Sequence, residues 1–256
     1  MDKIIINNLT LEYSDGTESL RNINLKIPAN QMSVLFGPAG GGKSTLLRVI
    51  NRLNDLADVI RIEGEVVITN GDGTTTDVLN LKTDVIALRR RIGMVFARPI
   101  VLPLSIRGNL TYGLEVAGVK NKQKLDEAVE RSLIQAALWE EVENRLDDPA
   151  MALSGGQQQR LCLARSLVLE PEIIMLDEPT SGLDPISTSK VEASLQELKS
   201  RYTVILVPHS VQQAARTADY AAFFLQGELV EHGPGKNLFV NPRDQRTEDY
   251  VEGRFG

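Results

Sequence analysis

The chain has 256 residues with 42% hydrophobic content, which excludes a disordered or fibrous protein and suits one large α/β domain, alone or with a helical insertion. Its 34 acidic and 28 basic residues give a net charge of -6, which argues weakly against nucleic acid or an anionic lipid surface as a partner. A single cysteine, Cys162, excludes an internal disulfide, and the Met-Asp-Lys start lacks the apolar segment of a secretory signal, so we expect a cytoplasmic protein.

The first part of the chain is predicted to begin with strands and to continue into a strand, a loop and a helix. Alternating apolar residues indicate strands at residues 4–6, 9–13 and 23–27. The apolar run Met32–Phe36 stops at Gly37, and residues 43–53 then carry leucine and isoleucine at helical spacing. The glycine-rich residues 70–76 indicate a turn between strands.

The rest of the chain is predicted to alternate helices with strands. Residues 104 to about 138 have a helical pattern with Ser105 as the expected cap. After them we expect a helix at 155–169, a buried strand at Ile173–Asp177, a helix at 185–199 and a buried strand at Thr203–Val207. This alternation predicts a mainly parallel sheet with helices on both faces. No stretch approaches the roughly 20 apolar residues that span a bilayer, so any spanning part would belong to another chain.

The strongest chemical signal lies between the predicted strand and helix near residue 40. It is a complete G-x-x-x-x-G-K-S/T phosphate loop, formed by Gly37, Pro38, Ala39, Gly40, Gly41, Gly42, Lys43, Ser44 and Thr45. Glycines let backbone N–H groups and the positive helix end approach the β-phosphate, while Lys43 would reach the β and γ oxygens and Ser44 would ligate Mg²⁺. The alternative is a chance glycine-rich turn, which the strand-to-helix context disfavours.

Two carboxylates, Asp177 and Glu178, follow four apolar residues at the end of a predicted buried strand. Open α/β sheets bind ligands at that end of their strands. We expect Asp177 to hold Mg²⁺ through its water shell and Glu178 to act as general base toward the attacking water. Taken alone, two acids at a strand end more often cap a helix, so this interpretation depends on the phosphate loop. Together the two motifs predict a nucleoside triphosphate hydrolase.

The segment Leu-Ser-Gly-Gly-Gln-Gln-Gln-Arg at residues 153–160 opens a predicted helix. A serine cap and two glycines would expose bare N–H groups at a positive helix end, which suits a terminal phosphate, although an ordinary capped helix is the alternative. At these residues the chain resembles the ABC ATPase family. The resemblance implies that this signature helix faces the γ-phosphate held by a second subunit, so that two ATP molecules lie between two chains. The signature residues it places at the nucleotide are Ser154, Gly155, Gly156 and Gln157.

The resemblance continues at three further places. Residues 181–184, Ser-Gly-Leu-Asp, are similar to the loop that crosses the family's dimer interface, which implies that Asp184 lies near nucleotide. His209 stands where the family has a histidine that contacts the γ-phosphate, so the implied catalytic residues are Lys43, Glu178 and His209; a lone histidine after a strand is usually structural. Tyr13 stands where the family stacks an aromatic ring on adenine, and packing of this ring within the sheet is the alternative.

Within the family, the chain resembles the phosphate-import ATPase subunits along four stretches, residues 153–163, 176–188, 212–219 and 246–256. The phosphate substrate is implied by this resemblance alone, because cargo passes through the membrane subunits. Two positions depart from the family pattern. Ala97 replaces a glutamine that contacts Mg²⁺ and water, and Pro208 replaces the threonine before the histidine. Ala97 argues against efficient turnover, because a methyl group neither coordinates a metal nor donates a hydrogen bond.

The predicted fold class is an α/β P-loop NTPase: a mainly parallel sheet core, an N-terminal antiparallel β portion and a helical insertion, which is the ABC ATPase fold. We predict a single ABC ATPase domain over residues 1–256. Its nucleotide-binding core is assigned to residues 1–96 and 158–256, and its helical insertion, which ends in the signature motif, to residues 97–157.

The resemblance implies an ATPase that uses MgATP as a homodimer on the inner face of the cell membrane. It would drive two transmembrane permease subunits, docked at residues 99–105 and the helical insertion, and indirectly serve a substrate-binding protein; nucleic acid is not expected. One alternative is a soluble ABC ATPase acting on DNA or ribosomes, for which fused paired cassettes or long coiled-coil insertions are typical. Another is a regulatory module that binds ATP but barely hydrolyses it. The retained Glu178 and His209 argue against that module, and Ala97 argues for it.

Overall fold

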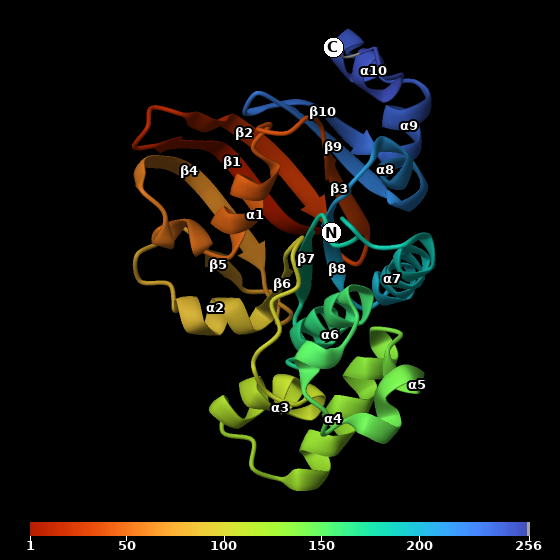
Figure 1. Cartoon of the computed structure of the whole chain (residues 1–256). Coiled ribbons are helices and arrows are strands. Elements are labelled where there is room, and N and C mark those ends of the chain that lie inside the picture. Colours follow the sequence, from red (N-terminus) through yellow and green to blue (C-terminus); the bar gives the residue numbers. More distant parts are fainter. Residues whose placement is uncertain (255–256) are drawn as a thin grey trace.

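The computed structural model describes residues 1–254, which fold into two β-sheets with helices around them (Figure 1). A four-stranded antiparallel sheet has the order β2-β1-β4-β5, and a six-stranded sheet has the order β10-β9-β3-β8-β7-β6. The strands are β1 (Asp2–Tyr13), β2 (Glu18–Pro28), β3 (Met32–Phe36), β4 (Val59–Thr69), β5 (Thr75–Asp77), β6 (Ile92–Val95), β7 (Ile173–Asp177), β8 (Thr203–Val207), β9 (Tyr220–Leu225) and β10 (Glu228–Pro234).

The two strands predicted at residues 4–6 and 9–13 are parts of one strand, β1, because a bulge and not a turn lies between them. Asn8 has a left-handed backbone with φ 50°, and the pairing with β2 shifts between Ile6 and Leu9. Across the bulge on β4, a Cβ atom at Gly64 would lie 2.5 Å from the Asn8 carbonyl oxygen, so only glycine fits there.

The six-stranded sheet is parallel except for its edge strand β10, as the alternation of helices and strands predicted. Strands β3, β7 and β8 have the bounds expected from the sequence. Along β7, Ile174 and Leu176 enter the core that contains helical residues, whereas Ile173 and Met175 enter the core shared with the four-stranded sheet. Both faces are therefore buried, which explains the continuous apolar runs.

Helices surround the sheets, and α3, α4 and α5, which lie between β6 and β7 in the chain, form a helical lobe (Figure 1). They are α1 (Lys43–Ile50), α2 (Val85–Arg91), α3 (Ile106–Val116), α4 (Lys122–Gln135), α5 (Trp139–Val142), α6 (Gly155–Leu167), α7 (Pro185–Leu198), α8 (Val211–Thr217), α9 (Gly235–Val240) and α10 (Gln245–Val251). Within residues 1–254, the 3-10 helices are η1 (Leu53–Leu56), η2 (Glu143–Arg145) and η3 (Ala150–Ala152).

The predicted helical region at 104–138 consists of two helices, α3 and α4. Ser105 caps α3 as expected, accepting a hydrogen bond from the Gly108 N–H, and the chain turns between the helices at Gly118, which has φ 90°. Other helices end slightly earlier than their periodicity indicated, α1 at Ile50 and α6 at Leu167. The domain boundary proposed at residue 157 falls in the first turn of α6.

The C-terminal helices α9 and α10 pack against the end of β3, the strand that leads into the phosphate loop. The ring of Phe36 lies 5.2 Å from that of Phe223 and 4.8 Å from that of Phe239, and Phe223 lies 5.1 Å from Tyr250. Phe255 and Gly256, which belong to the resemblance at 246–256, lie outside the described residues. Within residues 1–254, no helix has the length and apolar character required to cross a membrane.

Candidate nucleotide site

The phosphate loop connects β3 to α1 and depends on glycine for its shape. Gly37 has φ 137°, and a Cβ atom there would lie 2.0 Å from the Phe224 carbonyl oxygen. Gly42, the N-cap of α1, has φ 98°, and its Cβ would lie 2.4 Å from the Ser19 carbonyl oxygen. No side chain caps α1, so its first N–H groups stay available to an anion.

Lys43 lies inside the loop. Its side-chain nitrogen donates to the carbonyl oxygens of Gly37 at 2.9 Å and Pro38 at 2.8 Å, and only 9% of the residue is exposed. Burial lowers the pKa of the Lys43 ammonium group, and the carboxylates of Glu178 and Asp177 partly oppose this shift. The electrostatic influence of both acids on Lys43 places the two sequence motifs in one site.

Ser44 and Asp177 are 133 residues apart in sequence and meet at the carboxyl end of β7. The Ser44 hydroxyl donates to the Asp177 carboxylate at 3.0 Å. Mg²⁺ commonly takes one or two protein oxygens and completes its shell with water and phosphate oxygens, so this pair suits the ion. Among residues 1–254, no cluster of three or more His, Cys, Asp or Glu side chains is arranged to hold a metal.

Glu178 and His209 follow neighbouring parallel strands. Glu178 adopts a left-handed backbone with φ 49°, which costs energy for a residue other than glycine, and its N–H donates to the Val207 carbonyl oxygen at 2.9 Å. His209 is exposed just beyond β8, and its N–H donates to Gln213 at 2.9 Å. The two side chains thus stand at the same edge of the sheet as the phosphate loop.

Tyr13 ends β1 beside the phosphate loop. Its ring packs against the core shared by the two sheets, and its hydroxyl lies 3.4 Å from the Thr45 hydroxyl, which also lies 2.8 Å from that of Ser19. The residue as a whole is half-buried. Packing in the sheet is therefore observed, and stacking on adenine stays a prediction.

The signature residues form the first turn of α6 with a capping box. The Ser154 hydroxyl accepts from the Gln157 N–H, and the Gln157 side chain accepts from the Ser154 N–H. No heavy atom lies within 4 Å of a Cβ built at Gly155, whereas one at Gly156 would meet Ser187 of α7 at 2.6 Å. Asp184 caps α7 through the Ile186 and Ser187 N–H groups. One side of the signature turn is open and the other is packed.

Glu141 of α5 was not identified from the sequence, yet it holds the signature helix in place. Its carboxylate accepts two hydrogen bonds from Arg160, at 2.8 and 3.0 Å, one from Gln157 at 2.9 Å and one from Lys190. The hydrogen bonds from Arg160, the largest favourable influence, lower the pKa of Glu141 to about 2. Because Arg160 is 3% exposed, Glu141 supplies its main compensating charge.

We expect Glu141→Gln to lower the free energy of unfolding at neutral pH by about 2–3 kcal/mol, because a buried guanidinium loses its charged partner. A lowered pKa in the folded state stabilises the protein above the ordinary value of 4.5, and this contribution is lost as the pH falls toward about 2. The difference between parent and variant should therefore shrink over that range in urea unfolding. Glu140→Gln, at an exposed neighbour, is the matched control, and equal stability of the parent and Glu141→Gln at pH 7 would contradict the assignment.

Ala97, the position that departs from the family pattern, follows directly on the exposed Phe96. The Phe96 carbonyl oxygen accepts from the Gln159 side-chain amide at 2.8 Å, so the signature helix is joined to the backbone just before Ala97. Gln159 is buried, and within residues 1–254 its side-chain oxygen has no hydrogen-bond partner. This link could not be predicted from the sequence, since it joins residues 63 positions apart.

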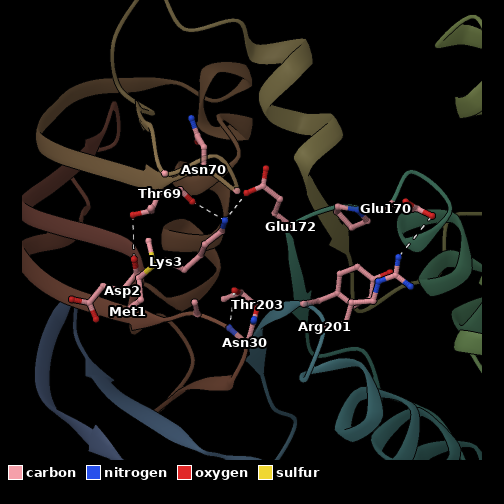
Figure 2. A pocket seen from close by; sticks show the side chains of 15 residues that line it. Met1, Asp2, Lys3, Asn30, Thr69, Asn70, Glu170, Glu172, Arg201 and Thr203 are labelled. Atoms are coloured by element: carbon pink, nitrogen blue, oxygen red, sulfur yellow. Dashed lines mark hydrogen bonds and ion pairs between the residues drawn. The ribbon is translucent and has the colours of Figure 1, made fainter.

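A cavity of about 420 Å³ lies at the opposite end of the parallel strands (Figure 2). It is lined by residues that precede or begin strands β3, β7 and β8, including Asn30, Glu172 and Thr203. Two of its charges pair with each other, because Lys3 donates to Glu172; Lys3 also donates to the Thr69 carbonyl oxygen, as the dashed lines in Figure 2 show. Open α/β sheets bind their ligands at the carboxyl ends of strands, so this cavity is separate from the candidate nucleotide site.

Comparison with known proteins agrees with this geometry. The family model described as ABC transporter matches residues 20–181, and the chain belongs to that family. It is 51% identical over 251 residues to the phosphate import ATP-binding protein PstB of Shewanella denitrificans, covering 98% of this chain and 90% of that protein. It is 53% identical over 253 residues to phosphate import ATP-binding protein PstB 2 of Aliivibrio fischeri, covering 99% and 91%. The family assignment made from the signature segment is confirmed.

Solved structures show the same fold. The chain resembles cbiO1 of Clostridium perfringens, part of the ABC transporter complex cbiONQ, with a TM-score of 0.80, 27% identity and coverage of 99% of this chain and 97% of that one. It also resembles an ATP-binding cassette whose dimeric structure represents a post-hydrolysis state bound to ADP and Pi, with a TM-score of 0.77, 29% identity and coverage of 91% and 99%. The predicted ABC ATPase fold is confirmed.

Proposed function

We propose that this chain is the ATP-hydrolysing subunit that energises an ABC importer of inorganic phosphate. The observation that carries the proposal is the nearly full-length identity of 51–53% to proteins named for phosphate import and ATP binding. The contact between the phosphate loop and the strand-end carboxylates supports the assignment of ATP hydrolysis. Ser44 donates a hydrogen bond to Asp177, and the carboxylates of Asp177 and Glu178 both oppose the lowering of the Lys43 pKa.

In this proposal the residues divide the work of hydrolysis. Lys43 and the bare N–H groups of the phosphate loop bind the β- and γ-phosphates, with Ser44 and Asp177 as the residues that would hold Mg²⁺. When bound there, the ion would neutralise charge on the phosphate oxygens. Glu178 accepts a proton from the attacking water, and His209 orients that water and contacts the γ-phosphate. All of these groups lie at one edge of the parallel sheet.

We further propose that two copies enclose two ATP molecules. The open side of the signature turn at Gly155 offers N–H groups at a positive helix end, and nothing within the described chain covers it.

Two transmembrane permease subunits would dock at residues 99–105 and the helical lobe, where Ile100 is 62% and Leu104 is 40% exposed. The chain would then sit peripherally on the cytoplasmic face of the membrane, with a substrate-binding protein acting indirectly through the permease.

Reconstitution with the permease subunits and substrate-binding protein tests this function. We expect MgATP-dependent uptake of labelled phosphate into vesicles, and hydrolysis that rises when phosphate and its binding protein are present. Sulfate, a tetrahedral oxyanion of different protonation state, is the control cargo and should neither enter nor stimulate hydrolysis. Transport of another solute without phosphate uptake would overturn the substrate assignment and leave the ATPase assignment in place.

A second candidate function, an ATP-binding regulatory module with weak hydrolysis, is favoured by Ala97. A glutamine there would offer a carbonyl oxygen to Mg²⁺ and an amide to water, groups whose loss affects the transition state more than ground-state binding. We expect Ala97→Gln to raise turnover roughly severalfold to a hundredfold, with little change in ATP affinity, because one oriented polar group is worth up to that factor. Single-turnover hydrolysis under saturating MgATP measures it.

Equal single-turnover rates for the parent and Ala97→Gln would mean that the missing glutamine does not limit the chemistry. Ala97→Leu serves as the control, because it enlarges the side chain without adding a polar group. Rapid hydrolysis by the parent protein would exclude the regulatory module. The effect of Ala97 would then be sought in coupling to the permease.

A further inference from the structure

Gln213 is a buried amide that joins two functional segments of the candidate site. It lies in the first turn of α8, is 3% exposed, and accepts a hydrogen bond from the His209 N–H at 2.9 Å through its side-chain oxygen. Its side-chain nitrogen donates to the Thr180 hydroxyl at 3.0 Å. Thr180 follows the proposed general base Glu178 by two residues, so the Gln213 side chain joins the segment after Glu178 to the backbone of His209.

The orientation of this amide is determined by its third partner. The Gln213 nitrogen also donates to the Glu192 carboxylate at 2.9 Å, and Glu192 in turn accepts two hydrogen bonds from Arg216 at 2.6 and 2.8 Å. A carboxylate held by an arginine only accepts, so the nitrogen must face Glu192 and the oxygen must face His209. The pKa of Glu192 is held below its ordinary value, chiefly by the hydrogen bonds from Arg216.

The bridge does more than cap α8. The Ser210 hydroxyl already caps this helix by accepting from the Gln213 N–H at 3.2 Å. Pro208 has no backbone N–H, so it cannot donate a hydrogen bond that would hold this part of the chain. The backbone N–H of His209 itself is therefore the donor through which a neighbour can hold the histidine. At the other end of the bridge, Glu178 has a left-handed backbone that its surroundings must maintain, and the buried Thr180 lies two residues further along the chain.

We propose that Gln213 is a positioning residue for ATP hydrolysis, which holds His209 and the Glu178–Thr180 segment in one fixed relative placement. The inference rests on the proposed roles of Glu178 and His209. It assigns to α8 a part in catalysis without contact to ATP, since Gln213 acts through the two segments that it joins. A displacement of about 1 Å between reacting groups lowers a rate by up to roughly a hundredfold, so a lost bridge should be visible in turnover.

The first test compares Gln213→Leu with Gln212→Leu, an exposed neighbour on the same helix. We expect Gln213→Leu to lower single-turnover hydrolysis about ten- to a hundredfold while ATP affinity changes less than about threefold. The chain has two histidines, so a His232→Gln background leaves one imidazole for NMR. The His209 imidazole resonances should shift in Gln213→Leu and not in Gln212→Leu. Unshifted resonances together with turnover equal to Gln212→Leu would overturn the proposal.

Thr180→Val provides a second variant that preserves shape, should Gln213→Leu fail to fold. We expect Thr180→Val to slow hydrolysis as Gln213→Leu does. The double variant Thr180→Val with Gln213→Leu should be no slower than the slower single variant, because both substitutions remove the same Thr180–Gln213 hydrogen bond. A Thr180→Val rate equal to that of the parent, or fully additive losses, would overturn the bridge. His209→Ala separates the two levels: full turnover in that variant refutes the proposed role of His209, whereas slow His209→Ala beside fast Gln213→Leu and Thr180→Val refutes only the positioning role.

Discussion

The Glu178→Gln variant is expected to hydrolyse ATP roughly a hundred to ten thousand times more slowly than the parent, because its amide cannot accept the proton of the attacking water. ATP should still bind, since Lys43, Ser44 and the loop N–H groups grip the phosphates. Single-turnover hydrolysis and equilibrium binding of labelled ATP measure the two effects. Glu130→Gln, at an exposed position on α4, is the control for a carboxylate-to-amide change and should match the parent.

The same variant also tests the proposed dimer. With hydrolysis stalled, the closed two-chain state should accumulate in MgATP and stay rare without it, because the signature turn then holds a γ-phosphate that is not lost. Size-exclusion chromatography with and without MgATP detects the change. A monomer in both conditions, even after addition of permease subunits, would count against the enclosed arrangement, and rapid hydrolysis by Glu178→Gln would remove Glu178 as the base.

Lys43→Ala is expected to weaken ATP binding by about 1.5–3 kcal/mol, a factor of roughly ten to more than a hundred, because a charge-assisted hydrogen bond is lost from a desolvated site. In the structure, Lys43 donates to the carbonyl oxygens of Gly37 and Pro38, which it would exchange for phosphate oxygens. Titration with labelled ATP measures the affinity. Arg48→Ala removes a cation from the exposed side of the same helix and should bind as the parent does.

A folding control is needed because Lys43 also bridges its own loop. Thermal unfolding of Lys43→Ala without nucleotide should show an intact domain, since α1 buries Leu46, Leu47 and Ile50 independently of the lysine. A folded Lys43→Ala that binds ATP as tightly as the parent would mean that the nucleotide lies elsewhere.

Features that depend on neighbours in sequence could be predicted from the sequence. Strands β3, β7 and β8 are short apolar runs buried on both faces, so their composition identifies them without knowledge of their partners. The phosphate loop needs glycines at Gly37 and Gly42 because backbone atoms approach too closely for any Cβ, and that requirement appears directly as a motif. The Ser154 cap likewise acts within one helical turn.

Features that join distant segments were decided only by the tertiary structure. Ser44 meets Asp177 across 133 residues, Arg160 meets Glu141 across 19, and Gln213 joins Thr180 to His209. A glutamate on a short helix or a glutamine near a helix start has many equally plausible roles in a sequence, because a polar side chain takes its function from the partners that packing brings to it. The parallel order β3-β8-β7 brings the segments after these strands to one sheet edge, where Ser44 meets Asp177 and Gln213 joins Thr180 to His209, whereas Arg160 meets Glu141 through the packing of α6 against α5.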